Sequence, residues 1–171
     1  MYAIRRARLR ELPQLCALEQ LAGERFREVG LAHVADAEPR SVVELTGACE
    51  AGRLFVVDDG SEPVGFALVE WVDGLPHLAE ISVAMDHGRR GLGRRLVEFV
   101  CAWARALGHD AVTLSTFRDV PWNGPFYRRL GFEALDPDSV GPGLARIREE
   151  EQAHGLDPAS RDLMRRELAD P

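Results

Sequence analysis

The sequence predicts a mixed α/β domain of the α+β type, with a largely antiparallel twisted sheet flanked by helices. Two observations lead to this fold class. Two helical patterns are followed by three β-rich runs, and after them helical and strand patterns alternate to the end of the chain. The chain has 171 residues, the size of one ordinary domain, and 46% of them are hydrophobic, enough for one core. We therefore expect a single domain over residues 1–171.

The first third of the chain is expected to be mostly helical. Residues 2–7 can form a short edge strand. From about Leu9 to Val29 the apolar residues recur mostly at three-residue steps, as an amphipathic helix requires. Ser41 is a suitable N-cap for a second helix, which Gly52 would end.

The period then changes to that of strands. The runs "LFVVDD", "VGFALVEWV" and "HLAEISV" are joined by the turn sequences "DGSEP" and "DGLP". They predict an antiparallel meander that begins the motif-bearing core, residues 54–136.

Helices and strands are expected to alternate in the second half. A helix with one apolar face begins at Leu92 and stops near Gly108, and "AVTLSTF" is a strand. A short helix in "NGPFYRRLGF" ends at Gly131, and a strand follows from about Phe132. "GLARIREEEQAHG" is helical, and "RDLMRREL" fits a short helix or a closing strand, of which we favour the strand. This helix and strand span residues 142–168.

Composition and residue spacing exclude several classes of protein. The chain has 21 basic and 28 acidic residues, a net charge of −7, which argues against a nucleic-acid partner. No apolar run approaches the ~20 residues of a membrane span, and no signal peptide is recognised at the start. Cys16, Cys49 and Cys101 match no zinc or redox spacing, and the histidines are scattered. We expect a cytoplasmic protein with unpaired thiols, no metal and no membrane partner.

The segment "ISVAMDHGRRGLGRRLVEFV" has a strand running through a glycine-rich, basic loop directly into a helix. Backbone N–H groups at a helix N-terminus lack intrahelical partners and lie at the positive end of the helix dipole, which suits phosphate. The segment supplies glycines that let a phosphate approach the main chain and arginines that add positive charge: Gly88, Gly91, Gly93, Arg89, Arg90, Arg94 and Arg95. Neither a Walker A nor a dinucleotide-binding glycine pattern is present. The alternative is a glycine turn before a solvated basic helix start.

Two segments carry a family resemblance. Val83, Gly91, Leu92, Gly93 and Leu96 form a V-x7-G-L-G-x-x-L pattern, which resembles the acetyl-CoA pyrophosphate loop of the GNAT superfamily of N-acetyltransferases. Downstream, "WNGPFYRRLGF" resembles that family's N-x-x-x-Y-x-x-x-G-F signature, filled here by Asn123, Tyr127, Gly131 and Phe132. The resemblance covers residues 2–136 and is only architectural before residue 54. The chain departs from the family pattern at three positions. Gly88 stands where the family usually has Gln or Arg. Arg89 stands where Gly is frequent, and Met85 stands where Pro is frequent.

The resemblance implies acetyl-CoA as co-substrate and direct transfer of its acetyl group to a primary amine in a ternary complex. It implies that Ile81, Ser82 and Val83 pair with the pantetheine arm and polarise the thioester. The diphosphate would bind Gly88, Arg89, Arg90, Gly91, Leu92, Gly93 and Arg94. Asn123 would hydrogen-bond the coenzyme, or cap a helix, or do both. Tyr127 would protonate the leaving thiolate, unless it is only a core aromatic.

The general base is left open between two residues of one strand. His77 and Glu80 are an odd number of residues apart, so their side chains lie on opposite faces and only one can face the acceptor; Glu80 shares its face with Ser82. Alternatively His77 is a surface histidine, Glu80 is a salt-bridged carboxylate, and water carries the proton. The acceptor is expected to be a small-molecule or peptide amine, and a homodimer is possible. The other functions considered are a non-catalytic acyl-CoA-binding module and an interaction domain whose loop binds another anion.

Overall fold

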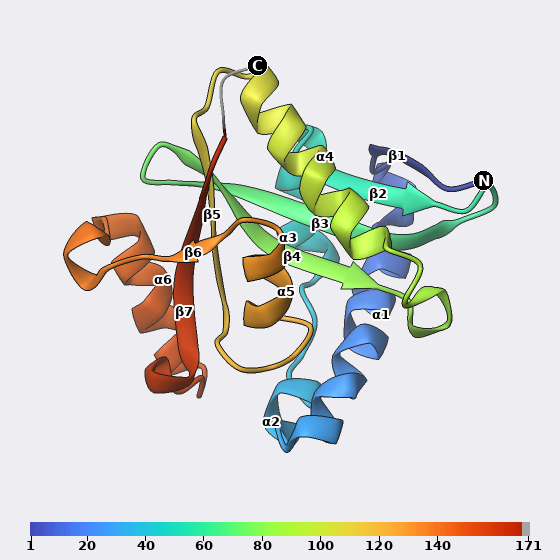
Figure 1. Ribbon diagram of the computed structural model, residues 1–171. Helices are drawn as coiled ribbons and strands as arrows, with labels where there is room; N and C mark the ends of the chain where they lie inside the picture. The colour runs from blue at the N-terminus through green and yellow to red at the C-terminus, as the bar shows by residue number, and fades with distance from the viewer. Residues whose placement is uncertain (169–171) are drawn as a thin grey trace. The chain divides into compact units, whose positions relative to one another are not determined.

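The computed structural model describes residues 1–168 (Figure 1). Seven strands form one sheet in the order β1-β2-β3-β4-β5-β7-β6. Their bounds in chain order are β1 Ala3–Arg6, β2 Leu54–Asp58, β3 Pro63–Val72, β4 Leu75–Val83, β5 Ala111–Phe117, β6 Glu133–Ala134 and β7 Arg161–Glu167. β4 and β5 pair in parallel, whereas the pairs β1–β2, β2–β3, β5–β7 and β6–β7 are antiparallel. The predicted fold class, a mixed and mostly antiparallel sheet flanked by helices, is confirmed.

The helices follow the predicted order, with two differences, of which one is the short helix α2 (Ala32–Ala35), which was not predicted. The helices are α1 Leu12–Gly23, α2 Ala32–Ala35, α3 Val42–Glu50, α4 Leu92–Ala106, α5 Gly124–Arg129 and α6 Pro142–Ala153. The single helix predicted from Leu9 to Val29 is instead α1 with a 3-10 turn on each side, at Leu9–Glu11 and Glu24–Val29. Gly30 ends the second turn in the left-handed conformation, φ 76°. Three-residue steps suit a 3-10 turn as well as an α-helix, which is why the pattern did not separate the two.

Two local predictions are confirmed. The Ser41 hydroxyl accepts a hydrogen bond from the Glu44 N–H, and the Glu44 carboxylate accepts one from the Ser41 N–H at 2.7 Å, which makes a capping box at the start of α3. The segment at Arg161–Glu167 is a strand, β7, which pairs with β5 and β6.

Two compact units divide the chain. The first comprises Met1–Val69 and Glu80–Val100, and the second comprises Glu70–Ala79 and the residues from Cys101 onward. Fully buried side chains of the first unit include Leu12, Leu15, Leu45, Phe55, Phe66, Leu92 and Leu96; those of the second include Val112, Leu114, Phe132 and Met164.

All three cysteines lie outside disulfides, with Cys16 and Cys49 half-buried and Cys101 buried. Burial raises the pKa of the Cys16 thiol and that of the Cys49 thiol above the usual value for cysteine. Across residues 1–168 no helix combines the length and the apolar character needed to cross a bilayer. Within the same range no three His, Cys, Asp or Glu side chains gather in a metal-binding group.

Candidate active site

The loop between β4 and α4 presents a run of unpaired backbone N–H groups. The Gly88 N–H donates to the Met85 carbonyl at 3.1 Å, and the Arg95 N–H donates to the Gly91 carbonyl at 3.0 Å, the first bond of α4. Between them, the N–H groups of the six residues from Arg89 to Arg94 donate to no group of residues 1–168. These donors lie at and before the N-terminus of a fifteen-residue helix, where the helix dipole favours an anion.

Two residues of this loop have positive φ angles. Gly91 has φ 72°, and Arg89 has φ 60°, an uncommon conformation for a residue with a side chain. A Cβ added at Gly91 would meet no atom within 4 Å, so backbone conformation rather than crowding by the protein favours glycine there. The left-handed conformation at Arg89 costs about 1–2 kcal/mol, and such strain is typical of functional loops.

The four arginines of the loop divide into two pairs. The Arg90 guanidinium donates to the Tyr2 hydroxyl at 2.8 Å, and the Arg95 guanidinium donates to the Tyr2 carbonyl at 3.0 Å, so both are held by the N-terminal strand segment. The side chains of Arg89 and Arg94 have no hydrogen-bond or ion-pair partner among residues 1–168. Arg89 and Arg94 are therefore the guanidinium groups that an incoming anion can use without breaking existing bonds.

The end of β4 lies against a glycine of β3. A Cβ at Gly65 would stand 2.9 Å from the Ser82 carbonyl oxygen and 3.2 Å from Val83 Cγ2, so any larger residue would push these strand backbones apart. Ser82 is buried, whereas Ile81 and Val83 are half-buried. The Ser82 hydroxyl donates to the Glu80 carboxylate at 2.9 Å. Glu80 and Ser82 therefore share one face, as the alternation of strand residues predicts.

Glu80 belongs to an ionic cluster that sequence reasoning missed. The Arg40 guanidinium nitrogen Nη1 lies 2.8 Å from Glu19 Oε1 and 3.1 Å from Glu80 Oε2. Burial, and secondly the charge of Glu80, raises the pKa of Glu19 to about 7, although Arg40 acts in the opposite direction. The one signal in the sequence was that Glu19 stands four residues after Leu15, a buried residue of α1, and so lies on the same face of the helix. Nothing in the spacing indicated Arg40.

His77 lies in the second unit and is buried, with 3% of its surface exposed. Its Nδ1 is 2.9 Å from the Thr113 hydroxyl, on the residue that pairs with it in β5. Burial lowers the pKa of His77 to about 4, so the imidazole is neutral at physiological pH. These are the surroundings of a histidine that holds two strands together.

The second signature segment folds around a tight approach of two backbone stretches. A Cβ at Gly124 would be 2.2 Å from the Arg118 carbonyl oxygen, so only glycine fits at the start of α5. The Asn123 side chain does not cap α5, because its amide donates to the Trp122 carbonyl at 3.2 Å. Tyr127 is 9% exposed, and its ring meets Phe126 and Phe132 edge-on, with centroids 5.1 and 5.8 Å apart.

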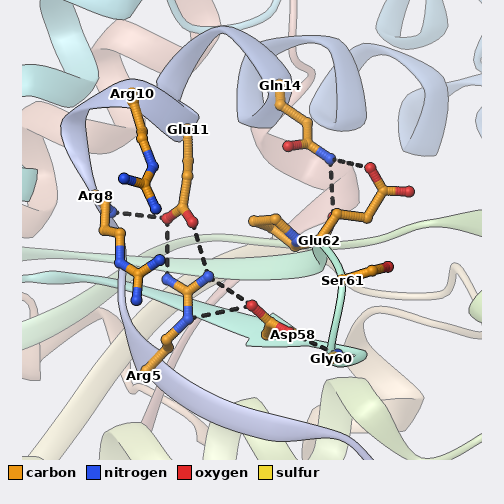
Figure 2. Close-up of a pocket in the computed structure, with 10 residues that line it drawn as sticks. Arg5, Arg8, Arg10, Glu11, Gln14, Asp58, Gly60, Ser61 and Glu62 are labelled. Carbon is orange, nitrogen blue, oxygen red and sulfur yellow. Dashed lines mark hydrogen bonds and ion pairs between the residues drawn. The ribbon is translucent and has the colours of Figure 1, made fainter.

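A pocket of about 520 Å³ in the first unit is lined by none of the predicted site residues. Figure 2 shows the Arg5 guanidinium between the carboxylates of Glu11 and Asp58, with nitrogen–oxygen distances of 2.7 and 2.6 Å. In the same pocket the Gln14 side-chain amide donates a hydrogen bond to the Glu62 carboxylate at 2.9 Å. These contacts tie β1, α1 and the β2–β3 turn together, and we read the pocket as a structural feature.

Solved structures share this fold. N-acetylglutamate synthase from Neisseria gonorrhoeae, complexed with coenzyme A and N-acetyl-glutamate, is 17% identical with a TM-score of 0.75; the match covers 99% of this chain and 36% of that protein. This chain thus spans about a third of that relative's length. The ribosomal-protein-S18-alanine N-acetyltransferase from Escherichia coli is 18% identical with a TM-score of 0.69, covering 100% and 96% of the two chains. The PaiA N-acetyltransferase from Thermoplasma acidophilum, in complex with coenzyme A, is 13% identical with a TM-score of 0.73, covering 98% and 99%.

The sequence also matches a family model. Residues 15–132 fit the model described as the acetyltransferase (GNAT) family, and the match is longer than half of the chain. It includes both the glycine loop and the segment that carries Asn123 and Tyr127. On this match, and with a fold that its solved members share, the chain belongs to the GNAT family of acetyltransferases.

Proposed function

We propose that this protein is an acetyl-CoA-dependent N-acetyltransferase that passes the acetyl group directly to a primary amine within a ternary complex. The observation that carries the proposal is the run of open N–H groups from Arg89 to Arg94 at the start of α4. Such donors fit the coenzyme diphosphate, and Arg89 and Arg94 can add charge to that contact. The presence of coenzyme A in the related N. gonorrhoeae and T. acidophilum structures supports an acyl-CoA substrate.

Gly88 has its own N–H bonded to Met85, so we assign the diphosphate to the residues after it. Arg90 keeps a role through its backbone N–H, because its side chain is held by Tyr2. Ile81, Ser82 and Val83 are proposed to hold the pantetheine arm, with a backbone N–H polarising the thioester carbonyl. Asn123 is proposed to hydrogen-bond the coenzyme; its amide group does not cap the helix that follows it.

In the proposed reaction the amine lone pair forms a bond with the thioester carbonyl carbon. The nitrogen then loses a proton to water, and the carbon–sulfur bond breaks with its electrons on sulfur. Tyr127 gives its phenolic proton to that thiolate and regains one from solvent. Of the two candidates for contact with the amine, Glu80 is favoured. His77 is buried and neutral, and its Nδ1 is already paired with Thr113.

The alternative is an acyl-CoA-binding module that performs no transfer. The Glu80 carboxylate favours it, because both of its oxygens are already engaged, by Arg40 and Ser82. The cytoplasmic location, the possible homodimer and the single domain stay predictions.

A thiol-release assay separates the two functions. Purified protein is mixed with acetyl-CoA and, separately, spermidine, kanamycin, lysine, glutamate and a peptide with an N-terminal alanine. Transfer predicts amine-dependent thiol release and an acetylated product detected by mass spectrometry. Acetyl-CoA binding by calorimetry without any product would favour the binding module, and absence of binding would remove both functions.

A further inference from the structure

The glycine loop before α4, residues 85–91, makes few contacts of its own. All of its residues except His87 are exposed. Its backbone bonds to the protein only at its start, where the N–H groups of His87 and Gly88 donate to the Ala84 and Met85 carbonyls. Arg89 also has the left-handed φ of 60°, a strained conformation that persists only where the surrounding structure enforces it. The loop therefore depends on side chains from elsewhere to keep its shape.

The side chain that reaches the loop is that of Tyr2. Among the residues that the structure describes, Tyr2 is the one outside the loop whose side chain hydrogen-bonds to it. The Tyr2 hydroxyl oxygen lies 2.9 Å from His87 Nδ1 and accepts a hydrogen bond from Arg90 Nη1 at 2.8 Å. The Tyr2 and His87 rings also meet edge-on, with centroids 5.8 Å apart. Because Arg95 donates to the Tyr2 carbonyl at 3.0 Å, Tyr2 contacts the chain both before and after the open N–H groups.

The hydrogen bonds at the Tyr2 hydroxyl have a defined direction. A guanidinium can only donate, so the Tyr2 oxygen accepts from Arg90. Its own proton is then available to His87, whose Nδ1 accepts it when the ring proton is on Nε2. One hydroxyl group thus acts both as donor and as acceptor, and it links two residues of the loop.

The sheet fixes the position of Tyr2 itself. Tyr2 directly precedes β1, whose first residue, Ala3, pairs with Asp58 of β2. The Met1 amino group also donates to the Asp59 carbonyl at 3.3 Å. Groups placed by a regular element are positioned more precisely than groups on loops. Tyr2 can therefore pass the rigidity of the sheet to the loop.

We propose that Tyr2 is a positioning residue for coenzyme binding, which ties His87 to Arg90 and so holds the loop in the conformation that accepts the diphosphate. The inference rests on the proposed function and names a residue outside the glycine loop on which that function depends. Tyr2 acts by raising the fraction of the protein whose loop is ready to bind. Apparent affinity falls in proportion to that fraction, so loss of the hydroxyl should weaken diphosphate binding and leave the chemical step unchanged.

Tyr2→Phe removes the hydroxyl and keeps both the ring and the backbone bond to Arg95. The dissociation constant of coenzyme A, measured by calorimetry, should rise about threefold to tenfold, the effect of one or two hydrogen bonds. With the best amine of the panel above, KM for acetyl-CoA should rise while kcat stays the same, because the loss is in binding. The control Thr46→Val removes a hydroxyl that donates to the Val42 carbonyl at 2.7 Å in α3, and it should leave coenzyme affinity unchanged.

A truncated substrate separates positioning of the diphosphate from general damage to the protein. S-acetylpantetheine has the thioester and the pantetheine arm but no diphosphate. Wild type and Tyr2→Phe should therefore use it with equal kcat/KM, whereas with acetyl-CoA the variant should be threefold to tenfold poorer.

Substitution of His87 gives a conservative rescue. Asparagine has a side-chain oxygen that can accept the Tyr2 proton in place of Nδ1, whereas leucine has no acceptor. His87→Asn should therefore bind coenzyme A as wild type does, and His87→Leu should be weakened. The double variant Tyr2→Phe/His87→Leu should lose no more than Tyr2→Phe alone, because both changes remove the same hydrogen bond. Equal affinities in His87→Asn and His87→Leu would contradict the link through His87.

Hydrogen exchange in the ligand-free protein is independent of turnover. By NMR, the amides of Gly88 and Arg95, whose hydrogen bonds lie on either side of the open donors, should exchange faster in Tyr2→Phe than in wild type and in Thr46→Val. Wild-type exchange or wild-type coenzyme affinity in Tyr2→Phe overturns the proposal, and so does an equal loss of kcat/KM with S-acetylpantetheine.

The same measurements distinguish this proposal from the proposed function. If coenzyme A binds and no amine is acetylated, acetyl transfer fails as the function, while calorimetry and hydrogen exchange still decide the role of Tyr2. If wild type does not bind coenzyme A at all, both proposals fail.

Discussion

Replacing Gly91 by alanine tests the phosphate loop most directly. Gly91 has φ 72°, and a Cβ added there meets nothing within 4 Å of the protein. The left-handed conformation costs an alanine about 1–2 kcal/mol of folding stability. The methyl group would also stand on the backbone between open N–H donors. A hydrogen bond to a charged group is worth about 1.5–3 kcal/mol, so losing one should weaken coenzyme A binding about tenfold to a hundredfold.

Gly30→Ala is the matched control. Gly30 has φ 76° and also has nothing within 4 Å of its added Cβ, so it carries the same backbone cost at a site remote in sequence from the loop. Both variants should lose similar unfolding free energy in urea, whereas only Gly91→Ala should lose affinity for coenzyme A in calorimetry. Unchanged affinity in Gly91→Ala, together with the expected loss of stability, would refute the assignment of the diphosphate to these N–H groups.

Three other substitutions test separate parts of the molecule. Tyr127→Phe should lower kcat about 100-fold while acetyl-CoA affinity stays the same; steady-state kinetics that match wild type would remove the acid role. Gly124→Ala should cost about 2 kcal/mol, because its Cβ would overlap the Arg118 carbonyl, and a thermal melt equal to that of the helical control Gly47→Ala would contradict this. His77 has a folded pKa of about 4 against 6.5 when unfolded, so the unfolded chain binds the extra proton and stability falls as pH drops from 6.5 to 4. Relative to wild type, His77→Gln should therefore gain about 3 kcal/mol between pH 7 and pH 4 in urea titrations, and parallel pH curves would show that His77 is not buried as a neutral base.

The strands and helices could be predicted because their signals are local. The Ser41 capping box, the alternation along β3 and β4, and the glycines of the loop all act within a few residues. The same holds for the helix start at Leu92, where a glycine loop leads directly into an apolar stripe.

The features that sequence reasoning missed depend on tertiary contacts. Glu19, Arg40 and Glu80 are far apart in the chain, and only the folded structure brings their charges together, with Arg40 bonded to both carboxylates. A tertiary contact also explains why the Arg90 side chain is held by the protein whereas that of Arg89 is not. The partner of Arg90 is the Tyr2 hydroxyl, which lies 88 residues earlier in the chain. The roles assigned to the predicted site residues stay predictions.

The half-buried thiols of Cys16 and Cys49 affect how the released coenzyme is measured. Chromogenic disulfide reagents react with thiolates, not with protonated thiols. Because burial raises the pKa of both cysteines, each stays protonated and partly shielded near neutral pH. The coenzyme thiol set free in water reacts readily by comparison. The colour should therefore report product over a small, slowly growing blank, and the native cysteines need no replacement before the enzyme is assayed.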